Sequence, residues 1–199
     1  MTKYFKILFY FLFIFEADVK EILKKLEEYI NLNKDSNNSI KKESIKNFLW
    51  EKESKIQDLL RFIREPKPKE YEKYFHSSES TYEKLPNINP NLVPIKNKDG
   101  ENSFYCAISI ILYGDDSRWY WFKVGILYYF IKNEKPFPIA FNQDFFDEAS
   151  KRIEKQIKIY SSAGEILFES KCENSEKTSI LIAFNKDKNH FIPFLLVNT

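Results

Sequence analysis

The chain has 199 residues, of which 43% are hydrophobic and 17% aromatic, and its 31 basic and 29 acidic residues leave a net charge of +2. The apolar content is sufficient for a packed core, and the length fits one domain with additional helices. The balanced charge argues against a dedicated nucleic-acid binder, which usually concentrates basic residues on one face. With only 4 glycines, repeated glycine-rich phosphate loops are excluded.

Residues that bind metals or form disulfides are few. The two cysteines, Cys106 and Cys172, allow one bridge at most. The two histidines are His76 and His190, and the sequence has neither a Cys-x-x-Cys nor a His-Glu-x-x-His pattern, so a zinc site is not expected. We therefore expect no cofactor.

The N-terminus predicts a secretory signal peptide over residues 1–17. Lys3 and Lys6 give a basic start, residues 7–15 are all apolar, and Ala17 offers a small residue for cleavage. The apolar run is too short to span a bilayer, which takes about 20 residues. A buried first helix and a membrane-surface anchor are the alternatives. The signal peptide predicts secretion, and a cytoplasmic location is the alternative.

A helical extension is predicted over residues 18–65. Apolar residues recur at three-and-four spacing over residues 18–31 and 39–64, so we expect one helix in each range. Residues 66–91 are polar and rich in proline, and are predicted to be a linker.

The remaining residues, 92–199, predict an α+β domain. Helices are expected at residues 103–112, 118–132 and 143–156, and strands at 157–161, 165–169, 179–184 and 191–197. We expect the helices to pack on a small mixed or antiparallel sheet.

A turn at Lys98-Asp99-Gly100 leads into the first of these helices, with Ser103 at the predicted N-cap. The backbone N–H groups at a helix N-terminus have no partner within the helix and carry the positive end of its dipole. A nucleophile placed there has its anion stabilised, and adjacent N–H groups can bind a developing oxyanion.

Residues 102–109, Asn-Ser-Phe-Tyr-Cys-Ala-Ile-Ser, resemble the catalytic segment of the ovarian-tumour (OTU) family of cysteine proteases, the deubiquitinases. The family pattern is Asp-Gly-Asn-Cys, two aromatic or aliphatic residues, one variable residue, then Ala-Ile-Ser. Here Ser103 replaces the nucleophilic cysteine, and the additional Glu101 moves Asp99 and Gly100 one step upstream. Near the C-terminus, residues 189–193, Asn-His-Phe-Ile-Pro, resemble the segment that carries the catalytic histidine.

The resemblance implies an OTU-like fold and hydrolysis of isopeptide bonds to ubiquitin or a ubiquitin-like protein. It implies a nucleophile at position 103 and a general base at His190, at the start of the final strand and at the edge of the sheet. It also implies oxyanion donors in the backbone around Asn102 and Ser103. The residue that orients the histidine, an Asn or Asp two positions later in the family, is Ile192 here. The candidates to replace it are Asn189, Asp187 and Asp99.

Serine at the nucleophile position leaves the activity open, because a serine hydroxyl is far less acidic than a thiol. The chain is then a natural pseudoenzyme, carries an engineered inactivating change, or keeps some activity through Ser103 or another residue such as Cys106. The alternative function is a secreted, non-enzymatic interaction protein that uses the OTU fold as a scaffold. The aromatic residues Trp119, Tyr120 and Trp121 belong either to the core or to a partner surface.

Overall fold

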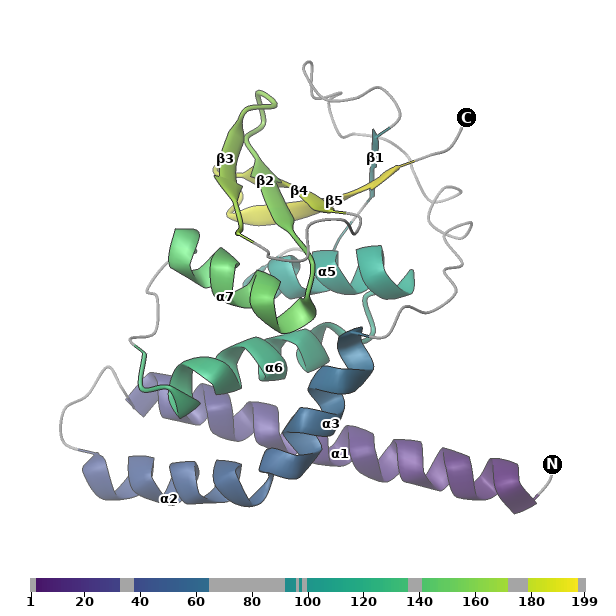
Figure 1. Cartoon of the computed structure of the whole chain (residues 1–199), viewed down its shortest axis with the longest axis vertical. Coiled ribbons are helices and arrows are strands. Elements are labelled where there is room, and N and C mark those ends of the chain that lie inside the picture. Colours follow the sequence, from purple (N-terminus) through teal and green to yellow (C-terminus); the bar gives the residue numbers. More distant parts are fainter. Residues whose placement is uncertain are drawn as a thin grey trace. The chain divides into compact units, whose positions relative to one another are not determined.

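The computed structural model describes residues 3–32, 38–64, 92–95, 97, 100–135, 141–171 and 179–196, with the backbone alone for residues 3–14 and 196. The chain divides into two compact units (Figure 1). The first consists of residues 1–62 and 123–137, and the second of residues 63–122 and 138–199. Helix α6 (Trp119–Lys132) crosses this division. The predicted linker at residues 66–91, with His76, lies outside the described residues.

The first unit is helical. It contains α1 (Lys3–Leu32), α2 (Ser39–Glu51), most of α3 (Glu53–Arg64) and the second half of α6. The predicted helix at residues 18–31 is confirmed as the second half of α1, whose buried residues are Val19, Ile22, Leu23 and Leu26. Among the described helices, none combines the length and the apolar character needed to cross a membrane.

One helix was predicted over residues 39–64, and this prediction is wrong at Lys52. The backbone of Lys52 has φ −91° and ψ 2°, outside the helical range, and α2 and α3 run in different directions on its two sides (Figure 1). Asp18 of α1 binds the amines of both Lys52 and Lys55, which holds the junction against α1. The sequence contains no glycine or proline there, so the usual signal of a break is missing.

The second half of α6 is tied to the N-terminal helices by ion pairs. Lys123 contacts Glu27 of α1 at 2.6 Å, and Lys132 contacts Glu53 of α3. Burial, together with the neighbouring Glu53 carboxylate, raises the pKa of Tyr128 to about 12. The first unit is thus completed by a segment that follows α3 by about 60 residues in the chain.

The second unit contains a five-stranded mixed sheet, which confirms the predicted α+β class. The strands are β1 (Leu92–Pro94), β2 (Ile157–Tyr160), β3 (Ile166–Glu169), β4 (Ile180–Asn185) and β5 (His190–Leu196), in the order β1-β5-β4-β2-β3. Strands β2 and β4 are parallel, and the other neighbours are antiparallel. Strand β1 was not predicted, because three residues ending in proline give almost no strand signal.

Two helices of this unit, α5 (Ser103–Tyr113) and α7 (Gln143–Ile153), cover one face of the sheet (Figure 1). Helix α5 contacts β4 and β5, and α7 contacts β2 and β3. The ring of Phe104 lies between both layers, 5.3–5.5 Å from the rings of Phe141, Phe145, Phe146 and Phe191. Helix α5 is buried on nearly every side rather than along one stripe, and Gly114 ends it at φ 76°, as predicted.

Helix α7 is shorter than predicted. Asn142 caps its start, where the side-chain oxygen accepts the N–H of Phe145 at 2.9 Å. The helix ends at Ile153 because Glu154 adopts the left-handed conformation, with φ 54°.

Candidate functional site

The candidate site lies in the second unit, where the N-terminus of α5 meets the start of β5. Asn102 is the N-cap of α5, and its carbonyl accepts the N–H of Cys106 at 2.9 Å. Ser103 is therefore the first helical residue and not the predicted N-cap. Its N–H donates to the carbonyl of Gly100 at 3.0 Å, and its hydroxyl is directed at β5.

Ser103 and the backbone of β5 are joined by a hydrogen bond. The N–H of Phe191 donates to Oγ of Ser103 at 3.2 Å. Since Cα of His190 is two bonds from that nitrogen, it lies within about 5.6 Å of the serine oxygen. Both Ser103 and His190 are only 2% exposed. The structure thus brings position 103 next to the start of β5, inside the domain and not on an open surface.

Asn97 also joins the two elements, and it was not among the predicted site residues. Its side-chain amide donates to the carbonyl of Ser103 at 2.6 Å and to the carbonyl of Phe191 at 2.9 Å. The residue is 6% exposed. Its only sequence signal is a polar residue between two lysines ahead of a turn, which is typical of a surface loop.

These bonds continue the pairing of β1 with β5. Val93 pairs with Leu195, and the N–H of Ile95 then donates to the carbonyl of Pro193 at 2.9 Å. At Phe191, side chains of Asn97 and Ser103 take the place of a neighbouring strand. His190 was expected at the edge of the sheet. Strand β5 lies between β1 and β4 in the strand order, but β1 pairs only with Phe194, Leu195 and Leu196 and does not reach His190.

Two of the three predicted orienting residues lie in a surface turn. Asn189 and Asp187 are exposed in the turn between β4 and β5, where Asn189 has φ 48° and donates its N–H to the carbonyl of Lys186. Asp99 lies outside the described residues. The identity of an orienting residue therefore stays a prediction.

The remaining candidate residues are the two cysteines and the aromatic residues at the start of α6. Cys106 is 2% exposed within α5, while Cys172 lies outside the described residues, so their pairing stays untested. Tyr120 and Trp121 are buried, which confirms core positions for these two. The guanidinium of Arg118 stacks over the rings of Tyr113 and Trp121, at 4.7 and 5.2 Å from their centres.

Over the described ranges, no three His, Cys, Asp or Glu side chains form a cluster that could hold a metal ion.

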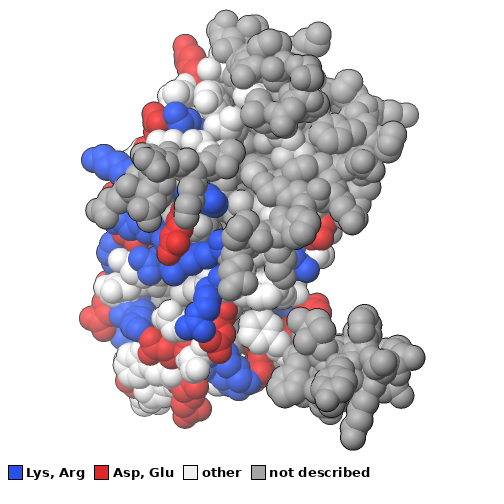
Figure 2. All heavy atoms as spheres, turned by 45° about the vertical axis from the view of Figure 1, so that its right-hand side comes forward, with Lys and Arg blue, Asp and Glu red and all other residues white. Residues whose placement is uncertain are grey.

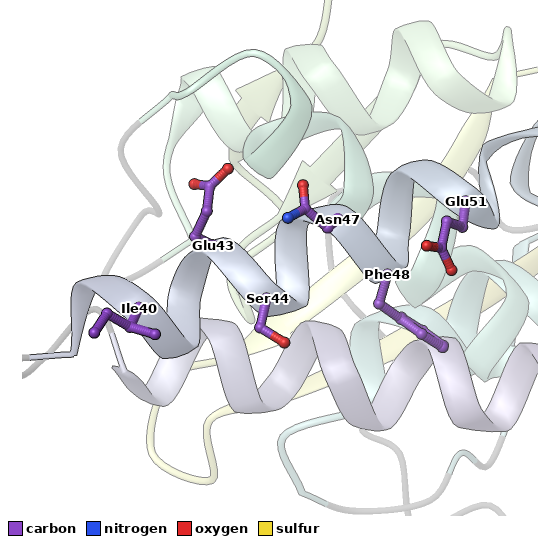
Figure 3. A pocket seen from close by; sticks show the side chains of 6 residues that line it. All are labelled: Ile40, Glu43, Ser44, Asn47, Phe48 and Glu51. Atoms are coloured by element: carbon purple, nitrogen blue, oxygen red, sulfur yellow. The ribbon is translucent and has the colours of Figure 1, made fainter.

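A surface hollow of about 560 Å³ lies in the first unit and is lined by α2 alone (Figure 3). Its residues are Ile40, Glu43, Ser44, Asn47, Phe48 and Glu51. Ser44 is its nucleophilic side chain, and among the described residues none of the lining side chains is a histidine that could activate a serine. We do not consider it a catalytic site.

Charges are mixed on the surface. Figure 2 shows Lys and Arg side chains interspersed with Asp and Glu over the coloured part of one face. This view fits the near-neutral net charge of the sequence. The expectation that the chain does not bind nucleic acid stays a prediction.

Comparison with protein-family models finds none that matches the sequence, and comparison with curated proteins finds none with significant similarity.

Proposed function

We propose that the chain is an OTU-like protein that binds ubiquitin or a ubiquitin-like protein and is impaired as an isopeptidase. The observation that carries the proposal is the hydrogen bond between Ser103 at the start of α5 and Phe191, the residue after His190. The two sequence segments that resemble the OTU family, residues 102–109 and 189–193, are 80 residues apart at their nearest ends. Their meeting at one point supports a common role.

The chemistry at this point would be acyl transfer. A nucleophile at position 103 attacks the isopeptide carbonyl, His190 accepts its proton and returns it to the departing lysine amine, and water then hydrolyses the acyl intermediate. Backbone N–H groups around Asn102 and Ser103 would stabilise the oxyanion.

Two features support impairment. A serine needs a well-oriented base to lose its proton, whereas a thiolate can be present at rest. In addition, the Ser103 oxygen already accepts the N–H of Phe191, and an attack that turns it away leaves a buried N–H without its partner. Such a loss costs about 1–3 kcal/mol.

The test is restoration of the thiol. Ser103→Cys protein is mixed with ubiquitin that carries a thiol-reactive electrophile at its C-terminus, and the adduct is detected by mass. We expect an adduct with Ser103→Cys and none with Ser103→Cys/His190→Gln, which keeps a polar side chain of similar size. The wild-type chain is the matched control, since it retains Cys106 and Cys172. An adduct that persists without His190 would contradict the proposed base.

The second candidate is a non-enzymatic interaction protein, which the burial of the site favours. The hydrogen bonds of Ser103 and Asn97 account for both side chains without catalysis. On this hypothesis the Ser103→Cys protein folds but forms no adduct. It also binds ubiquitin no better than a control protein does. Exposed side chains of α2, such as Ile40 at 87% and Trp50 at 49%, would then be candidates for the contact surface.

A further inference from the structure

The first half of α1 contains an uninterrupted apolar stretch. Residues 7–15 read Ile-Leu-Phe-Tyr-Phe-Leu-Phe-Ile-Phe, and they belong to one continuous helix, Lys3–Leu32. Nine residues make about 2.5 turns, so no side of this part of the helix is polar in sequence. A helix of this kind is stable only where apolar material surrounds it.

Ion pairs give the register of α1 against α2. Glu28 of α1 contacts Lys41, near the start of α2, at 3.0 Å, and Asp18 contacts Lys52, just after the end of α2, at 3.5 Å. The two helices are therefore antiparallel, and the residues of α1 ahead of Asp18 extend past the end of α2. Figure 1 shows this half of α1 continuing beyond both α2 and α3.

We propose that residues 7–15 of α1 bind the chain to the surface of a lipid bilayer. Lipid surrounds an embedded helix on every side, whereas a groove in a protein partner or a second copy of the chain covers one side. Positions 3 and 6 are lysines, which anionic headgroups attract. The occupant that fits both the apolar stretch and its basic flank is thus an anionic membrane.

The length of the apolar stretch limits how deeply the helix can enter the bilayer. Nine helical residues measure about 14 Å, against about 30 Å for the hydrocarbon core of a bilayer. Charged residues flank the stretch at both ends, Lys6 and Glu16. If the helix lay along the bilayer normal, one of these charged residues would lie near the middle of the membrane. The helix is therefore embedded in one leaflet at a shallow angle.

Vesicle flotation of the full chain tests the proposal, with the affinity tag at the C-terminus. The vesicles contain phosphatidylcholine with a minor fraction of phosphatidylserine. We expect the chain to float with them, and less of it to float when phosphatidylserine is omitted. Phe11→Glu places a charge in the apolar stretch and should lower vesicle binding at least about tenfold. Asn31→Glu adds the same charge at the exposed far end of α1 and should leave binding unchanged.

Circular dichroism of each variant checks folding, and Leu8→Gln is a second, uncharged variant with the same expected direction. Failure of the full chain to float, or equal flotation of Phe11→Glu, overturns the proposal. So does a stable dimer in solution that Phe11→Glu dissociates while neither protein binds vesicles, because the stretch is then covered by a second copy. A product from cells whose mass begins near Asp18 also overturns it and favours the signal peptide. None of these outcomes bears on the site at Ser103.

Discussion

At the scale of single residues, the Ser103 hydroxyl acts as an acceptor for strand β5. Its oxygen takes the N–H of Phe191 at a position where β1 has already ended. A hydroxyl has two acceptor sites and one hydrogen, so this bond leaves the hydroxyl hydrogen available for donation. One side chain can therefore have both a structural role and a role as a weak nucleophile. The two roles can be separated by the effect of substituting Ser103 on stability and on activity.

Ser103→Ala removes this acceptor and leaves a buried N–H without it. We expect the free energy of unfolding to fall by about 1–3 kcal/mol. Urea unfolding followed by tryptophan fluorescence measures the change. Ser162→Ala, in the exposed turn between β2 and β3, is the control and should have little effect. Equal stability of Ser103→Ala and the wild type would show that the bond is not structural.

The raised pKa of Tyr128 predicts that the free energy of unfolding falls at alkaline pH. Its pKa is raised to about 12 by burial and by Glu53, so the folded chain holds the phenol proton more tightly than the unfolded chain, whose tyrosines titrate near a pKa of about 10. The stabilisation is complete below pH 10 and is lost as the pH rises toward 12. Tyr128→Phe should therefore show a smaller loss of stability over this pH window in urea unfolding. The same slope in both proteins would contradict the assignment.

At the scale of elements, the junction of α5 with β5 depends on a residue that belongs to neither. Asn97 donates to a carbonyl at the start of each element. Side-chain amides are enriched in turns for local reasons, and nothing in a local sequence pattern distinguishes an asparagine that bonds to a strand 94 residues away.

Asn97→Ala should destabilise the second unit by about 1–3 kcal/mol, since it removes the side-chain donor of the buried Phe191 carbonyl. Asn97→Asp keeps the shape but presents carboxylate oxygens to the carbonyls, and we expect it to be at least as destabilising. Thermal unfolding of the three proteins provides the comparison. A stable Asn97→Asp protein would contradict a structural role for the two hydrogen bonds that the Asn97 amide donates.

Local patterns predicted most elements because each has a period or a terminator of its own. Residues 104–112 are apolar except for Ser109, and the helix that they form ends at Gly114. The last two strands are separated by a turn-forming segment at residues 185–189. The junction at Lys52 and strand β1 were missed, since contacts with α1 and with β5 determine them. For the site, the family resemblance predicted that positions 103 and 190 belong together, whereas spacing and periodicity alone would not have paired them.

At the scale of the whole molecule, the first unit is built from two distant parts of the chain. Helices α1 and α3 contact the second half of α6, whose buried residues include Val124, Ile126, Leu127, Phe130 and Ile131. An N-terminal extension that folds independently would not need this segment. The helices and α6 therefore depend on each other for burial.

Deletion of residues 1–62 should expose this apolar side of α6. We expect the shortened chain to aggregate or to bind a hydrophobic dye strongly, in contrast to the full chain. Gel filtration and dye fluorescence measure this, and co-expression of residues 1–62 as a separate chain should restore a soluble complex. A monomeric shortened chain that binds no dye would show that the second half of α6 does not need the N-terminal helices.

The division of the first unit also sets an order of events during synthesis. Helices α1–α3 leave the ribosome first, but the segment that completes their unit begins about 60 residues later, at Lys123. At 5–20 residues per second this delay lasts roughly 3–12 s, far longer than helix formation takes. The nascent N-terminal helices therefore wait for seconds with their apolar residues uncovered, and a chaperone that binds emerging chains would meet this protein as a substrate before α6 arrives.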